Sequence, residues 1–192
     1  EPPTGYRALC TQNLPDPDID DGTEHFNTAL WTGTGAANSI TGVGFQPDFV
    51  WTKCRSVATT AHTLNNVVSG VDKYLVSSRT NAESTLATIM TSFDSDGFTL
   101  GTHGLANTSG RTYVGWSWKA GGAGVANTDG SISSTVSANT TSGFSIVTFA
   151  GGSGTVGHGL SQAPELIIEK KTDTTSDWLA GTTVIDGTYD YV

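Results

Sequence analysis

The sequence is poor in charged residues, and the few that it carries are mostly acidic. Lys and Arg together number 9 and Asp and Glu 18, so charged residues make up only 14% of the chain and the formal net charge is -9. The basic residues are scattered along the chain, and a net negative protein repels the phosphate backbone of DNA or RNA. We therefore expect no nucleic-acid partner.

Long apolar runs are also missing. No stretch approaches the roughly 20 apolar residues that a membrane-spanning helix needs. The chain begins with Glu1 in a proline-rich segment, without the basic and apolar pattern of a signal peptide. These features predict no membrane insertion, and they suggest that the polypeptide extends further upstream.

Cysteine is scarce, and its spacing is not that of a metal site. Cys10 and Cys54 form no CxxC motif and have no histidine cluster beside them. We expect two free, packed thiols, with one bridge between them as the alternative. The four histidines lie at no metal-binding spacing either. No metal or other cofactor is expected.

One acidic stretch has the beginning of a calcium loop. Asp16, Asp18 and Asp20 alternate as the first ligands of an EF-hand do, but the sixth position is Asp21 and the twelfth is Asn27. An EF-hand needs Gly at the sixth position and a bidentate Glu at the twelfth. We interpret the stretch as a solvated acidic linker.

Glycine is abundant, at 24 residues, together with Ser, Thr and Asn, a composition that favours strands and turns over helices. The sequence predicts an all-β fold, a β-sandwich of the jelly-roll type. Asp94 to Gly97 has the chemistry of a hairpin turn. Only residues 80–90 suggest a short helix. The expected strands are 26–32, 47–53, 73–78, 86–93, 97–100, 111–120, 131–137, 143–150 and 165–170.

Tryptophan is the most informative aromatic residue. Trp116 and Trp118 are two positions apart in an expected strand, which places both indoles on one face. Buried packing is the interpretation favoured for Trp51 and Trp116, and less firmly for Trp31. Trp118, beside a glycine-rich segment, is expected nearer the rim. Trp31 and Trp118 are therefore the candidate contacts for a glycan or a protein partner.

The chain also repeats itself. The phrase GFQPDFVWTK at 44–53 returns as GLSQAPELIIEK at 159–170. Phe26 corresponds to Phe144 and Gly44 to Gly159, and after a two-residue insertion a constant offset of 117 relates Pro47 to Pro164 and Tyr74 to Tyr191. Agreement of Gly, Pro and apolar positions indicates a shared backbone path, and the unit is too long for a solenoid. The second copy has no counterpart of the Trp116 strand. The predicted division is a linker or upstream tail at 1–25, a first copy at 26–119, a glycine-rich junction at 120–130 and an incomplete second copy at 131–192.

The long phrases at 24–53, 91–101, 113–149 and 156–170 resemble a tandem domain of virion proteins, tail fibres above all, from marine tailed phages of the cyanophage type. The opening residues 1–15 resemble the end of a SPRY or concanavalin-like lectin module. The resemblance implies a β-sandwich in a virion or its appendage. It supplies no catalytic residues.

From this resemblance we expect a structural and adhesive virion protein, located at the particle surface or in a tail appendage. Its expected partners are other virion proteins, further copies of itself and host-surface polysaccharide. A purely architectural spacer, cement or decoration protein is the alternative. A polysaccharide-degrading tailspike domain is the third and least favoured, because the chain lacks a GxSxG motif and other hydrolase signatures.

Overall fold

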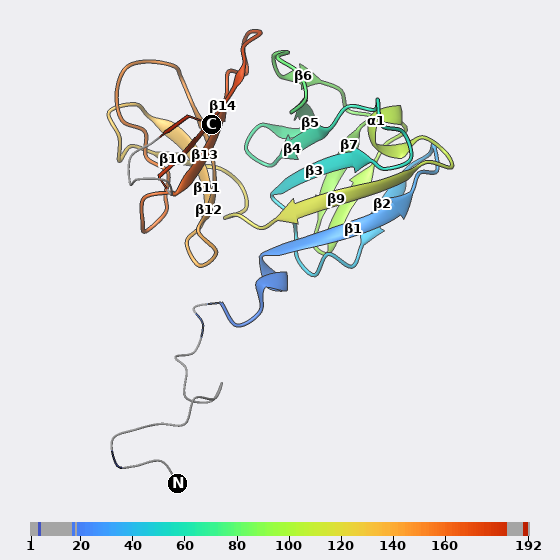
Figure 1. The fold of residues 1–192 in the computed structure, drawn as a ribbon, viewed down its shortest axis with the longest axis horizontal. Coiled ribbons are helices and arrows are strands. Elements are labelled where there is room, and N and C mark those ends of the chain that lie inside the picture. Colours follow the sequence, from blue (N-terminus) through green and yellow to red (C-terminus); the bar gives the residue numbers. More distant parts are fainter. Residues whose placement is uncertain (1–3, 5–16, 18, 184–189, 192) are drawn as a thin grey trace.

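Strands make up nearly all of the regular structure in this computed structural model, which describes residues 4, 17, 19–183 and 190–191 (Figure 1). All the strand ladders are antiparallel. The predicted all-β sandwich class is confirmed. Cys10, Asp16 and Asp18 lie outside the described residues, as does most of the predicted linker at 1–25.

The segment predicted as the first copy, residues 26–119, contains two sheets. The larger follows the order β1-β9-β3-β4-β5-β6, so that β9, late in the sequence, lies between two early strands (Figure 1). Its strands are β1 (Phe26–Thr32), β9 (Thr112–Trp118), β3 (Phe49–Cys54), β4 (Thr63–Asn66), β5 (Gly70–Leu75) and β6 (Ser84–Thr85). The smaller sheet, in the order β2-β8-β7, contains β2 (Asn38–Thr41), β8 (Gly97–Leu100) and β7 (Met90–Asp94).

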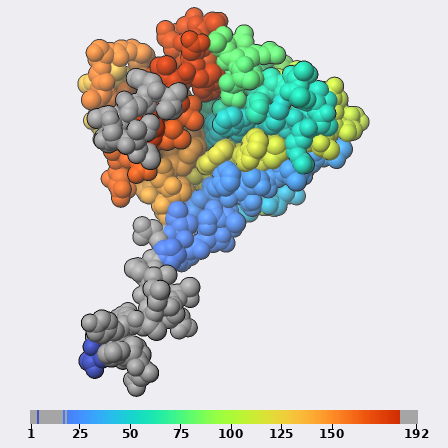
Figure 2. Space-filling view, viewed as in Figure 1, coloured from blue at the N-terminus to red at the C-terminus, as the bar shows by residue number. Residues whose placement is uncertain are grey.

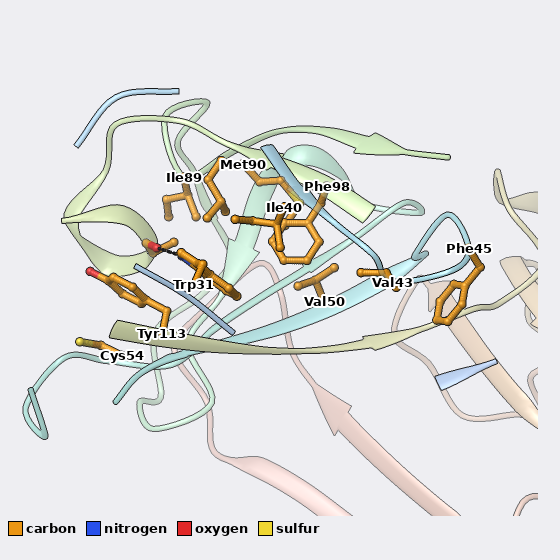
Figure 3. Packing of buried hydrophobic residues seen from close by; sticks show 12 residues of the cluster. Trp31, Ile40, Val43, Phe45, Val50, Cys54, Ile89, Met90, Phe98 and Tyr113 are labelled. Atoms are coloured by element: carbon orange, nitrogen blue, oxygen red, sulfur yellow. Dashed lines mark hydrogen bonds between the residues drawn. The ribbon is translucent and has the colours of Figure 1, made fainter. Parts of the chain in front are cut away.

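The core lies between these two sheets (Figure 3). The Trp31 ring stacks on Tyr113 with centroids 5.7 Å apart and meets Phe98 edge-on. Its indole N–H donates to the Ala106 carbonyl oxygen at 3.0 Å. Gly115 makes room for this ring, because a Cβ there would lie 3.1 Å from a ring carbon of Trp31. The face of β9 that carries Tyr113, Gly115 and Ser117 is therefore the buried face.

The opposite face of β9 carries its large residues. Tyr113, Gly115 and Ser117 are buried, whereas Trp116 and Trp118 are half-exposed. The predicted sharing of one face by the two indoles agrees with this alternation. The prediction that Trp116 belongs to the core is wrong, and so is the same prediction for Trp51. Both rings lie on the outer face, where they meet edge-on with centroids 6.3 Å apart.

The second copy consists of two three-stranded sheets. One follows the order β10-β11-β12 and contains β10 (Val125–Asn127), β11 (Ser134–Asn139) and β12 (Phe144–Phe149). The other follows the order β13-β14-β15 and contains β13 (Leu166–Lys170), β14 (Trp178–Thr182) and β15 (Asp190–Tyr191). Strand β10 falls within the predicted junction at 120–130, so that segment is not purely a linker.

Several features recur in both copies and agree with the predicted duplication. The orders β3-β4-β5 and β13-β14-β15 are the same, with β14 one residue out of the constant offset. Gly44 and Gly159, which correspond, both have positive φ angles, of 89° and 71°. The Asn27 amide donates to the Val43 carbonyl at 3.0 Å, and at the corresponding positions the Ser145 hydroxyl donates to the His158 carbonyl at 2.6 Å.

Some of the predicted strands and turns are confirmed, and one predicted helix is wrong. Strands 26–32 and 97–100 are confirmed to the residue, and Asp94 pairs with Gly97 across the predicted hairpin turn. The suggested helix at 80–90 is wrong, since that segment holds β6 and the beginning of β7. A four-residue helix, α1 (Gly104–Asn107), occurs where none was expected; the His103 ring accepts a hydrogen bond from the Leu105 amide at its start.

Hydrogen bonds at the start of the glycine-rich junction and at the loop 76–79 help to hold the two copies together. Asp48, a buried carboxylate, accepts hydrogen bonds through Oδ2 from the amides of Ala120 at 2.7 Å and Gly122 at 3.1 Å. At the other place, the Trp178 indole N–H donates to carbonyl oxygens of the loop at 76–79. Figure 2 shows the second copy, orange to red, lying directly against the green part of the first copy.

Asp48→Ala should destabilise the protein by about 2–4 kcal/mol, because it leaves the backbone amides of Ala120 and Gly122 without their carboxylate acceptor. Asp48→Asn should retain more stability, since the amide oxygen can still accept from both. Chemical denaturation measures the free energy of unfolding, with Asp129→Ala, at an exposed site, as the control. A loss from Asp48→Ala no larger than that of the control would contradict this role.

Candidate binding surface

A hollow of about 600 Å³ opens at the end of β9, where the chain crosses from the first copy to the second. Its volume lies within the range of small-ligand sites. Phe26, at the start of β1, Trp118, at the end of β9, and Phe144, at the start of β12, supply its aromatic lining. The remaining lining is mostly small or polar: Ile19, Gly22, Thr23, His25, Ser142 and Gly143.

Trp118 is the central ring of this aromatic group. Its centroid lies 4.8 Å from that of Phe26 and 5.4 Å from that of Phe49. Phe144 of the second copy stacks on it at 6.1 Å with an interplanar angle of 23°. A half-exposed indole held on three sides is a rigid platform of the kind on which an apolar sugar face can stack. The position agrees with the rim location expected for Trp118.

The structure corrects the expectation for Trp31. This ring is buried in the core, stacked on Tyr113, and its N–H is bonded to the Ala106 carbonyl. It therefore has no free face for a glycan or a partner. Sequence reasoning instead missed Phe26 and Phe144, although the repeat already aligned these two residues with each other.

Two aspartates from the acidic stretches singled out in the sequence, Asp21 and Asp96, have structural partners. Asp21 accepts hydrogen bonds from the amide and hydroxyl of Thr23 at the start of a short 3-10 turn (Gly22–Glu24). Asp96, in the hairpin turn, accepts from the amides of Gly42 at 3.0 Å and Gly44 at 2.7 Å. These two bonds lower the pKa of Asp96 below its ordinary value. Asp96 thus holds the turn that precedes β3.

The histidines lie apart from one another, each with its own hydrogen bond. His25 bonds to Asn139 across the two copies, and His158 accepts from the Leu160 amide within its glycine-flanked turn. Among the residues that the structure describes, no group of three His, Cys, Asp or Glu side chains is placed to hold a metal ion. The Cys54 thiol is free and buried, as predicted.

His62 belongs to the outer aromatic face. Its Nδ1 accepts a hydrogen bond of 2.8 Å from the Trp51 indole N–H, so this nitrogen must be unprotonated. Burial lowers the pKa of His62, and the positive charge of Lys53 lowers it further. The neutral imidazole therefore fixes the Trp51 ring at neutral pH.

Taken together, the fold and this surface define an all-β sandwich module with an aromatic hollow where the end of β9 lies beside the starts of β1 and β12. In the described part of the chain, no helix is both long and apolar enough to cross a membrane. The chain belongs to the DUF7483 family, a domain of unknown function whose match spans residues 21–192. No curated protein and no solved structure matches it significantly.

Lowering the pH should destabilise the protein through His62. The pKa of His62 in the folded protein lies below 6.5. As the pH falls through 6.5, the unfolded chain therefore binds a proton at His62 that the folded chain does not bind, and this favours unfolding. The free energy of unfolding should therefore fall between about pH 7.5 and about pH 5.5, and His62→Asn should show a smaller fall. Equal pH dependence in the two proteins would contradict this assignment.

Proposed function

We propose that this chain is a structural and adhesive module of a tailed-phage virion, part of a tail fibre or another surface appendage, and that it contacts host-surface glycans. The observation that carries the proposal is the aromatic hollow formed by Phe26, Trp118 and Phe144. Rings that are held in place by neighbours can stack on sugars at little entropic cost. The resemblance to virion proteins of marine tailed phages supports the same role.

A single hollow of this kind would bind a sugar only weakly. The lining offers few polar groups to fix a ligand, so stacking would have to supply most of the binding energy, and even a pair of aromatic rings gains only about 0.5–1.5 kcal/mol beyond its buried area. Many copies on one appendage would raise the effective affinity without any new contact. Multivalent display is therefore part of the proposed mechanism.

A purely architectural role is the second candidate. It is favoured by the apolar residues that strand β13 exposes, Leu166, Ile167 and Ile168, which suit contacts with another protein rather than with water. In that role the module would join virion subunits, and the hollow would serve only to pack the two copies together.

The two candidates are separated by matched variants of β1, displayed in many copies on a particle. Phe26→Ala should reduce binding to a glycan array and adsorption to marine cyanobacterial cells by about three- to tenfold, because it removes an aromatic wall of the hollow. Leu30→Ala is the control, since Leu30 is exposed on the same face of β1 but does not line the hollow.

No binding by the wild-type particle, on the array or on cells, would refute the adhesive role and leave the architectural one. An equal loss for both variants would show that adhesion uses another part of this face. Thermal unfolding of each variant checks that the fold is intact.

A further inference from the structure

Two strands of the second copy lie at sheet edges, although their counterparts share a neighbour in the first copy. In the first copy β9 is hydrogen-bonded to both β1 and β3. The corresponding strands, β12 and β13, are the last strand of one sheet and the first of another. Within the described residues, no strand joins β12 to β13 as β9 joins β1 to β3.

Strand β13 lies at the edge of its sheet, yet its side chains are the large apolar ones that are typical of a strand in the interior of a sheet. Ile167 is 41% exposed, whereas its counterpart in β3, Val50, is 0% exposed. Its neighbours Leu166 and Ile168 are 59% and 55% exposed, so both faces of the strand present large apolar groups. Proteins usually protect edge strands with charge, bulges or short length, because an open edge is a template for pairing. A three-residue apolar run at such an edge indicates that another strand covers it.

The surroundings of this edge keep the geometry of the first copy. Gly159 has the positive φ of Gly44, and the Ser145 hydroxyl bonds to the His158 carbonyl as Asn27 bonds to Val43. The turn that leads toward β13 is thus fastened to β12 as the corresponding turn of the first copy is fastened to β1. The second copy is arranged to receive a strand rather than folded into a different architecture.

We propose that β12 and β13 form an acceptor for an added antiparallel strand of the β9 type, supplied by a polypeptide segment with the pattern of Thr112–Trp118. Such a strand places Tyr, Gly and Ser on its buried face, at the positions of Tyr113, Gly115 and Ser117, and Trp or β-branched residues on the other. Main-chain hydrogen bonds to both edges would provide the affinity, as in other cases of strand addition. This inference does not depend on glycan binding.

Charge at one end of β13 supports the same occupant. Strand β9 is followed by Lys119, whose counterpart in the incoming segment would lie beside the exposed Glu165, because the Asp48 amide bonds to the Trp118 carbonyl in the first copy. Glu165 is also the counterpart of Asp48, the carboxylate that accepts the amides following β9 in the first copy. Glu165 would accept the corresponding amides of the incoming segment. Pairing of β13 with β13 of a second molecule would leave the β12 edge open, so it fits less well.

The test appends a second copy of residues 76–119 after Val192, which stands opposite Leu75 in the repeat, so the added segment enters in register. Amide hydrogen exchange in Phe144–Phe149 and Leu166–Lys170 should slow by about tenfold or more, since those edges become paired. The matched control is the same extension with Val114→Pro and Trp116→Pro in the added copy only, because proline cannot complete a ladder. The control should leave exchange unchanged, and β1 and β3 should be unaffected in both proteins.

A second experiment tests the same proposal if the extended protein does not fold. A labelled peptide with the sequence of residues 110–120 is titrated into the unmodified chain, with the double-proline peptide as its control. Saturable binding that slows exchange at β13 supports the proposal. No protection from either the extension or the peptide overturns it. Concentration-dependent dimerisation of the unmodified chain that protects β13 overturns it in favour of self-pairing.

Discussion

The insertion of β9 between β1 and β3 is the constraint on which the rest of this structure depends. Two segments that are close in sequence, β1 and β3, are joined only through a strand that comes some sixty residues later. Gly115 of β9 leaves room for the Trp31 ring, and the second sheet, β2-β8-β7, covers this ring from the other side. The sandwich can therefore form only when the whole first copy has been assembled.

The end of β9 fixes where the two copies meet. Trp118, its last residue, lies beside the first residues of β1, β3 and β12, which are all phenylalanines. Immediately beyond it, Asp48 accepts the amides of Ala120 and Gly122. The aromatic hollow and the segment that leads from the first copy to the second therefore both lie at the end of β9. A ligand in the hollow would contact both copies at once.

The sequence predicted some elements closely and missed others for recognisable reasons. Strand β8 was found because Phe98 and Leu100 alternate with other residues directly after a turn, and β1 because it is a short run rich in aromatic residues and threonine. Strand β4 was missed because its sequence, TLNN, is polar. Asn65 is nevertheless buried there, and its side-chain amide donates a hydrogen bond to the Lys73 carbonyl, a contact that the local sequence pattern does not predict. Strand β10 was missed because glycines surround it.

The candidate site was predicted only in part. Trp118 was correctly expected near the rim, because a glycine-rich segment follows it. Trp31 was misplaced, because its partners, Tyr113, Phe98 and the Ala106 carbonyl, come from residues about 70 to 80 positions away. The pairing of Phe26 with Phe144 in the repeat was visible, but not that Trp118 lies between them.

By itself, the sequence determined the all-β class and the alternation that puts Trp116 and Trp118 on one face, because these follow from local spacing. Only the tertiary structure decided which face of β9 is buried. The face with both tryptophans was predicted to be the core, yet the face with Tyr113, Gly115 and Ser117 is the one enclosed. The large side chains of Trp31 and Phe98 already fill the space between the sheets, and close packing there requires a glycine opposite them.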